Sequence, residues 1–129
     1  MGKQIVLIDS DQHFLKLVAS VLEGRGHKAL PCINLKEADE KIKTADMVIV
    51  GSPLSEGGEL PWLLEKRRAG MTAKLVLVGS SANYMEGLKN KLTADHSVSL
   101  SVHKPLIPYI FGAQVDRTLD DDKSEAAAQ

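Results

Sequence analysis

Four short segments contain the side chains of this chain that are best suited to chemistry. They are Asp9-Ser10-Asp11, Gly51-Ser52-Pro53, Gly79-Ser80-Ser81 and His103-Lys104-Pro105. Carboxylates such as those of Asp9 and Asp11 are ligands that Mg²⁺ prefers, and the ammonium group of Lys104 is a compact charge that attracts anions. The segments lie far apart in the sequence, so they can form one site only if the fold brings them together.

Each segment follows a short, largely apolar run, and these runs alternate with amphipathic stretches. The alternation is typical of repeated βα units. It predicts strands at Gln4–Ile8, Lys28–Cys32, Met47–Val50, Leu75–Val78 and Ser97–Val102. Uninterrupted apolar runs are expected in strands that are covered on both faces, whereas Pro31 favours an edge position for its strand.

Capping residues and helical spacing predict a helix after each strand. The predicted start signals are Asp11, Asn34 with Glu37, Pro61, Asn83 with Glu86, and Pro108. The fold class is therefore α/β: a doubly wound, parallel (βα)5 sheet of flavodoxin-like type with strand order 2-1-3-4-5. In such a sheet the four segments share the carboxyl edge, where ligands bind beside the first and third strands.

Length and composition limit the class of protein. The chain has 129 residues, 43% of them hydrophobic and 26% charged, which fits one domain over 1–119 and an acidic, alanine-rich tail or linker over 120–129. A net charge of −1 argues against nucleic acid or an anionic membrane as the partner. Cys32 is the only cysteine, which excludes an internal disulfide, and no apolar run is long enough to span a membrane. We therefore expect a cytoplasmic protein.

Taken in order, four longer stretches resemble a response-regulator receiver domain over about Lys3 to Leu119. They are IVLIDSDQHFLKLV, ADMVIVGSPLSEGG, AKLVLVGSSA and VHKPL. The resemblance implies two-component (phosphorelay) signalling, in which an aspartate after the third strand is phosphorylated. It also implies that two acids after the first strand bind Mg²⁺ and that a lysine after the fifth strand completes the site.

The chain keeps only part of the residue set that the resemblance implies. Asp9 and Lys104 fill the first acidic position and the lysine position. The remaining positions hold Ser10 (second acid), Gly51 (phosphoacceptor), Gly79 followed by Ser80 (hydroxyl after the fourth strand) and Ser101 (aromatic switch). Because Gly51 has no side chain to accept a phosphoryl group and Ser10 is no carboxylate, we predict a non-enzymatic pseudo-receiver that binds Mg²⁺ weakly or not at all.

Several of these residues also have a purely structural interpretation. Asp11 is expected to act as the N-cap of its helix. Lys104 is expected to pair with Asp9 across the vacated pocket. Gly51 is interpreted as a flexible turn, and Ser80 as a turn or capping residue. The four histidines are scattered, so no metal site is predicted.

Without a phosphorylation switch, the domain would act through contact with a signalling partner or by self-association. The resemblance places that contact on the face formed by the fourth helix, the fifth strand and the fifth helix. We expect Ile107, Ile110, Phe111 and Val115 to form the inner stripe of the last helix. Tyr109 falls on the opposite side as a candidate anchor, with Met85 at the edge of the same surface. Tyr109 is otherwise an ordinary surface residue.

Three further functions remain open at this point. The first is a phosphorylatable receiver that uses a non-standard site. The second is a domain that binds cobalamin or another small ligand, because Asp11-Gln12-His13 and Ser52-Pro53-Leu54 resemble elements of cobalamin-binding domains, although Lys16 and Ser80 stand where glycines are expected. The third is a docking domain of a larger protein that does not signal.

Overall fold

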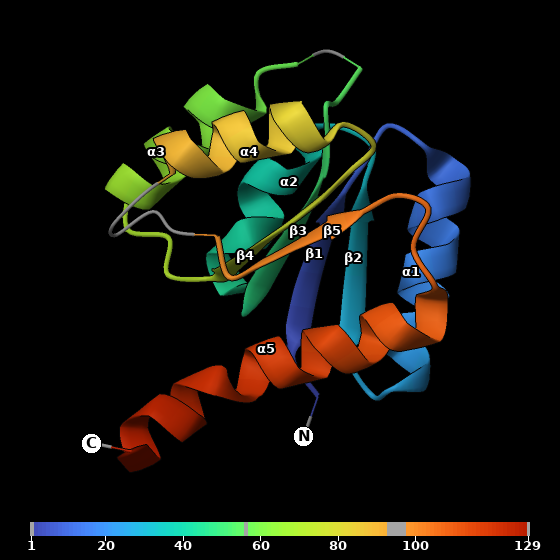
Figure 1. The fold of residues 1–129 in the computed structure, drawn as a ribbon, viewed down its shortest axis with the longest axis vertical. Coiled ribbons are helices and arrows are strands. Elements are labelled where there is room, and N and C mark those ends of the chain that lie inside the picture. The colour runs from blue at the N-terminus through green and yellow to red at the C-terminus, as the bar shows by residue number, and fades with distance from the viewer. Residues whose placement is uncertain (1, 56, 93–97, 129) are drawn as a thin grey trace.

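A computed structural model of the chain describes residues 2–55, 57–92 and 98–128. Within these residues, five parallel strands form one sheet in the order β2-β1-β3-β4-β5 (Figure 1). The strands are β1 (Gln4–Ile8), β2 (Lys28–Cys32), β3 (Met47–Ser52), β4 (Lys74–Gly79) and β5 (Leu100–His103). The predicted fold class and strand order are confirmed, and β2 lies at an edge as Pro31 indicated.

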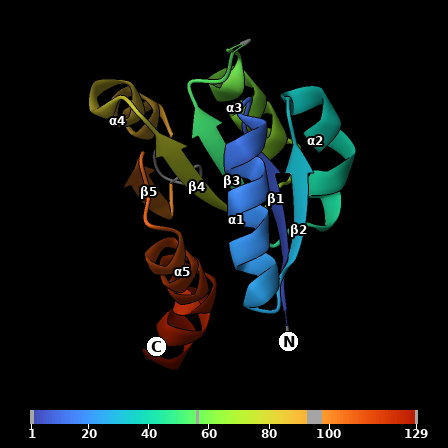
Figure 2. The same cartoon turned by 90° about the vertical axis from the view of Figure 1, so that its right-hand side faces the viewer.

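Helices cover both faces of the sheet (Figure 2). They are α1 (Gln12–Gly24), α2 (Leu35–Lys41) with the 3-10 turn η1 (Ile42–Thr44), α3 (Glu59–Arg68), α4 (Ala82–Lys91) and α5 (Pro108–Ala128). Helices α1 and α5 pack on one face, where Leu15 and Phe111 join one core cluster. Helices α2, α3 and α4 pack on the other face, where Trp62 and Leu88 join a second cluster.

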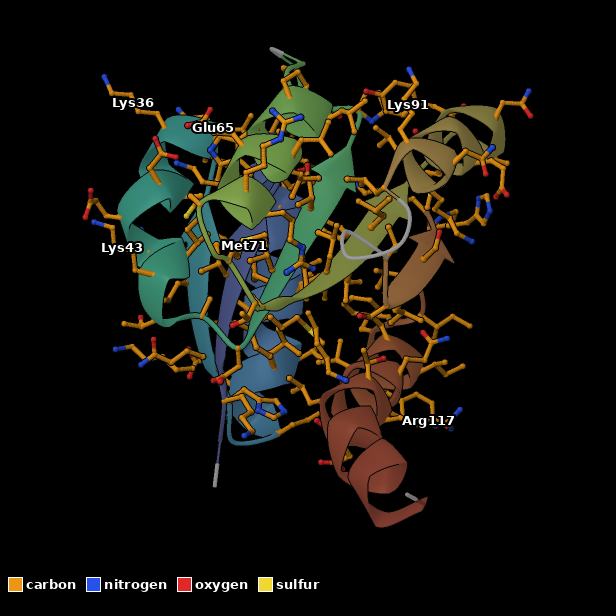
Figure 3. The ribbon with its side chains drawn as sticks, turned by 90° about the vertical axis from the view of Figure 1, so that its left-hand side faces the viewer. Lys36, Lys43, Glu65, Met71, Lys91 and Arg117 are labelled. Atoms are coloured by element: carbon orange, nitrogen blue, oxygen red, sulfur yellow. The ribbon has the colours of Figure 1, made fainter. Side chains whose placement is uncertain are left out.

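The apolar runs of the strands supply both clusters because successive side chains of a strand point to opposite faces. In β1, Ile5 and Leu7 belong to the α1–α5 side, whereas Val6 and Ile8 belong to the other side. The helices on that other side turn charged side chains to solvent, and Lys36, Glu65 and Lys91 point outward in Figure 3. The amphipathic helices and the uninterrupted apolar strands together account for the three layers of the domain, which are helices, sheet and helices.

Some predicted boundaries differ from the structure. Strand β3 continues through Gly51 and Ser52, because both residues stay paired with β4. Helix α4 is capped by Ser81 and not by Asn83, since Ser81 Oγ accepts a hydrogen bond from the Tyr84 N–H at 3.2 Å. The start of the predicted fifth strand, Ser97, lies outside the described residues. Helix α5 continues through residue 119, so the backbone of 120–128 is helical.

Three predicted side-chain placements are wrong, those of Ile107 and Ile110 on the inner stripe of the last helix and that of Met85 at the edge of the interaction surface. Met85 is 2% exposed and belongs to the core, because it lies three residues before Leu88 and both face the sheet from α4. Ile107 is 59% exposed, since it precedes the first residue of α5 and is not part of the helical stripe. Ile110 is 43% exposed, whereas its neighbour Phe111 is buried. Met85 is therefore excluded from any interaction surface.

In the part of the chain that the structure describes, no helix combines the length and the apolar character needed to cross a membrane.

Candidate functional site

Strand register brings the four segments to one edge of the sheet, as the sequence predicted. Ile8 pairs with Val50, so the residues that follow them, Asp9 and Gly51, are neighbours across β1 and β3. The Lys104 N–H donates to the Gly79 carbonyl at 2.8 Å, which places Lys104 beside the end of β4. The candidate site therefore lies at the carboxyl ends of β1, β3, β4 and β5.

The centre of the site is an ion pair between Asp9 and Lys104. Lys104 Nζ lies 2.8 Å from Asp9 Oδ2, and the Asp11 N–H donates to Asp9 Oδ1 at 2.9 Å. The Asp9 side chain is 7% exposed. Lys104 Nζ also lies 4.2 Å from the centre of the Phe14 ring, at cation–π distance. Both oxygens of the carboxylate have a partner, and the ammonium group is held by an anion and a ring. The pairing expected from the sequence is present.

Gly51 has a steric role that the sequence did not indicate. A Cβ atom placed on residue 51 would overlap Asp9 Oδ2 and lie 2.5 Å from Asp9 Cγ. Gly51 is a paired residue of β3, so its interpretation as a flexible turn is wrong. A larger residue 51 would therefore require the Asp9 side chain to move from its present position.

Ser10 and Asp11 both hold backbone groups of the surrounding loops. Ser10 Oγ accepts a hydrogen bond from the Ser55 N–H at 2.8 Å and so joins the loop after β1 to the loop after β3. Asp11 Oδ1 accepts from the N–H groups of His13 and Phe14 at 2.9 and 3.2 Å, which confirms that Asp11 is the N-cap of α1. Within the described residues, no three His, Cys, Asp or Glu side chains lie close enough to hold a metal ion.

Glu59 is a site residue that sequence reasoning missed. Its side chain is fully buried, and Oε2 accepts hydrogen bonds from the Leu54 N–H at 3.1 Å and from the Tyr84 hydroxyl at 3.2 Å. Glu59 therefore ties the loop after β3 to the first turn of α4. The sequence placed Glu59 only at the end of the loop before the helix predicted from Pro61, where an acidic side chain usually faces solvent.

The remaining predicted residues lie around this centre without joining it. Gly79 is buried at the end of β4, and Ser80 is exposed. Ser101 is half-buried in β5, opposite Leu77. Among the described residues, neither serine makes a hydrogen bond to Asp9 or Lys104. Tyr109 lies on the outer side of α5 and is 74% exposed, in the orientation that the sequence predicted.

Several solved structures that are similar to this chain are receiver domains. The receiver domain of a CheY-like response regulator from Methanospirillum hungatei JF-1 has a TM-score of 0.81 at 17% identity, over 97% of this chain and 99% of that one. The signal receiver domain of a putative LuxO repressor protein from Vibrio parahaemolyticus has a TM-score of 0.81 at 12% identity, over 100% and 98% of the two chains. The beryllofluoride-activated NtrC4 receiver domain dimer has a TM-score of 0.77 at 13% identity, over 92% and 97%.

Comparison of the sequence with family models finds no match, and comparison with curated proteins finds none either. At these low identities the structural similarity establishes the fold alone: the chain has a receiver-like α/β fold over nearly its whole length.

Proposed function

We propose that this domain is a pseudo-receiver, a two-component signalling domain that acts by protein–protein contact without being phosphorylated. The observation that carries the proposal is the Asp9 carboxylate, which fills the space above Gly51 and pairs with Lys104. The solved structures of the same fold, which are receiver domains, support the signalling context. The domain is then non-enzymatic and cytoplasmic.

The chemistry of phosphoryl transfer explains why this arrangement matters. An aspartyl phosphate forms when a carboxylate oxygen attacks phosphorus, and Gly51 offers no such oxygen. The Lys104 ammonium group, which would stabilise the charge of a phosphoryl group, already has Asp9 as its partner. Mg²⁺ takes about six oxygen ligands in near-octahedral geometry. Asp9 is paired, Asp11 caps a helix and Ser10 Oγ accepts an N–H, so the residue set does not fit the ion.

The proposed contact surface is the face of α4, β5 and α5. Three large side chains near the start of α5 are exposed: Ile107, just before the helix, and Tyr109 and Ile110 in its first turn. Aromatic side chains are enriched among residues that dominate binding energy, and their neighbours exclude water from the contact. The partner is a signalling protein or a second copy of this chain, bound through Tyr109 as the anchor.

The phosphorylation part of the proposal is tested by incubating the protein with acetyl phosphate and Mg²⁺ and measuring its intact mass. We expect no mass gain for the unmodified chain. The variant Gly51→Asp alone should also stay unmodified, because Asp9 occupies the same space. A gain of one phosphoryl group by the unmodified chain would show that the domain is a phosphorylatable receiver with a non-standard site.

The contact part is tested by sedimentation of the unmodified protein and by cross-linking in cell extract with a photoreactive residue at position 107. Tyr109→Ala should weaken the self-association or the cross-linked complex by roughly tenfold. Ser20→Ala, an exposed position on α1, is the control and should leave the complex unchanged. Equal effects of both variants would place the contact elsewhere.

A further inference from the structure

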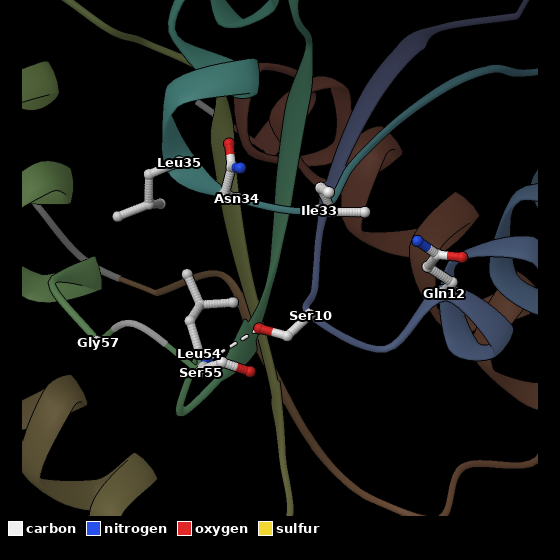
Figure 4. Close-up of a pocket in the computed structure, with 8 residues that line it drawn as sticks. All are labelled: Ser10, Gln12, Ile33, Asn34, Leu35, Leu54, Ser55 and Gly57. Carbon is white, nitrogen blue, oxygen red and sulfur yellow. Dashed lines mark hydrogen bonds between the residues drawn. The ribbon is translucent and has the colours of Figure 1, made fainter.

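The carboxyl edge of the sheet also carries a hollow of about 210 Å³ that does not include Asp9, Gly51 or Lys104. It lies between the loops that follow β1, β2 and β3 (Figure 4). Its walls are Ser10, Gln12, Ile33, Asn34, Leu35, Leu54, Ser55 and Gly57. Open α/β sheets bind small molecules at this place, where the strand order reverses between the first and third strands.

A second hollow of about 380 Å³ adjoins the first. Gln12 and Ile33 line both of them, so the two hollows meet at this pair of residues. Besides Gln12, Lys16 and Ile33, the second hollow is lined by Leu15, Ala19 and Pro31. Ile33 is 41% exposed, which is high for a large aliphatic side chain. We name the two hollows together the switch-point trough.

Hydrogen bonds from side chains to the backbone hold the walls of the first hollow. Ser10 Oγ accepts from the Ser55 N–H, shown as the dashed line in Figure 4. Asn34 Oδ1 accepts from the Glu37 N–H at 2.9 Å, and Glu37 Oε1 accepts from the Ile33 N–H at 3.1 Å. A ligand would therefore meet loops that are already ordered, which lowers the cost of binding.

The chemistry of the trough is neutral at one end and apolar at the other. The amide of Gln12, the Nδ2 group of Asn34 and the Ser55 hydroxyl have no hydrogen-bond partner among the described residues, so they can bind polar groups of a ligand. No charged side chain of the described residues lines the first hollow, and Lys16 is the one charged residue of the second. Among the described residues, the lining thus offers no pair of cations for a phosphate ester and no carboxylates for a metal ion.

We propose that the switch-point trough binds a small neutral amphiphile. Its head, with amide, carbonyl or hydroxyl groups, lies in the first hollow between Gln12 and Ser55. Its short alkyl chain passes Ile33 and covers the apolar side chains of the second hollow. This inference goes beyond the proposed function and does not depend on it, since neither residue of the Asp9–Lys104 pair lines the trough.

The test is an NMR titration of the ¹⁵N-labelled protein with N-acetyl-, N-butanoyl- and N-hexanoylethanolamine, which share a neutral head and differ in chain length. We expect saturable shifts at the amides of Gln12, Ile33 and Ser55, and a Kd that falls about two- to fourfold for each added CH₂ group. Ile33→Ser should weaken binding of the hexanoyl compound roughly fivefold and leave the acetyl compound nearly unchanged. Ser55→Ala should weaken all three compounds alike, because it removes a head contact.

The control is Leu17→Ser, which changes an exposed aliphatic side chain of α1 that lies outside the trough. Its amide spectrum and that of Ile33→Ser report whether each variant is folded. The proposal is overturned if no shift saturates up to the solubility limit, if Kd does not depend on chain length, or if Leu17→Ser weakens binding as much as Ile33→Ser does.

Discussion

The two edges of the sheet each hold a charged contact between residues far apart in the sequence, and the two contacts differ in burial. At the carboxyl edge, Asp9 and Lys104 are 95 residues apart, and the Asp9 side chain is 7% exposed. At the amino edge, Asp116 of α5 meets Arg25 Nε at 2.7 Å and His27 Nε2 at 2.6 Å, and its side chain is 33% exposed. The carboxylate of the first contact is nearly buried, whereas the carboxylate of the second is one-third exposed.

The difference in burial decides what each contact does. A buried charge that loses its partner remains without compensation, so the Asp9–Lys104 pair strongly favours its present geometry. A half-exposed pair is screened by solvent and contributes little. The amino-edge contact therefore holds α5 against the turn between α1 and β2 and contributes little to the free energy of unfolding. The carboxyl-edge contact holds the centre of the candidate site in its present geometry.

The largest expected effect comes from removing the partner of the buried carboxylate. Lys104→Met should lower the free energy of unfolding by roughly 3 kcal/mol, because the charge of Asp9 then stays buried and unpaired. The double variant Asp9→Asn with Lys104→Met should lose less than Lys104→Met alone, as measured by urea unfolding. If the two substitutions were additive, the pair would not be coupled and the comparison of the two edges would fail.

The next effect tests the space shared by Asp9 and residue 51. Gly51→Ala should destabilise the domain by about 1–3 kcal/mol, since the new methyl group overlaps the Asp9 side chain. Asp9→Ala should relieve most of this loss in the double variant. Gly87→Ala is the matched control: no atom lies within 4 Å of its Cβ position in α4, and it should stabilise the domain by about 0.5–1 kcal/mol. Equal behaviour of the two glycines in thermal unfolding would contradict the steric argument.

A smaller effect is expected at the amino edge. Burial by itself raises the pKa of Asp116. The hydrogen bonds from His27 and Arg25 lower this pKa by more than burial raises it, so it lies below the usual range of a carboxyl group. The ionised form is thus favoured in the folded state. Its contribution to stability is complete above the pKa of an unfolded carboxyl group and is lost as the pH falls through the folded pKa.

Asp116→Asn should therefore cost about 0.5–1 kcal/mol near neutral pH. The difference in stability between this variant and the unmodified chain should shrink as the pH falls below the pKa of an unfolded aspartate, about 4, and through the lower pKa of the folded state. Urea unfolding at several pH values measures it. If the difference in stability grew on acidification, the pKa of Asp116 would be raised in the folded state and not lowered.

The smallest effect separates the exposed start of α5 from its buried face. Tyr109→Ala should change the free energy of unfolding by no more than about 0.5 kcal/mol, because the ring lies in solvent. Phe111→Ala, two residues further on, removes a side chain that is 1% exposed and should cost about 3–5 kcal/mol. Comparable losses in calorimetry would mean that Tyr109 is part of the core and not available as an anchor.

The sequence by itself determined the strands, their order and most helix starts. Strand β1 has the predicted bounds, and Asp11 and Asn34 cap the helices that they were expected to cap. These features depend on apolar periodicity and on hydrogen bonds between residues two to four positions apart, so a short window of sequence contains their cause. The gathering of Asp9, Gly51 and Lys104 at one edge followed from the parallel topology.

Only the tertiary structure decided what these residues do to one another. Gly51 is explained by the side chain of Asp9, Ser10 by the N–H of Ser55, and the burial of Glu59 by Leu54 and Tyr84. Each of these roles depends on which atoms of distant segments come into contact. That information is absent from local periodicity, because side-chain packing is set by the whole fold.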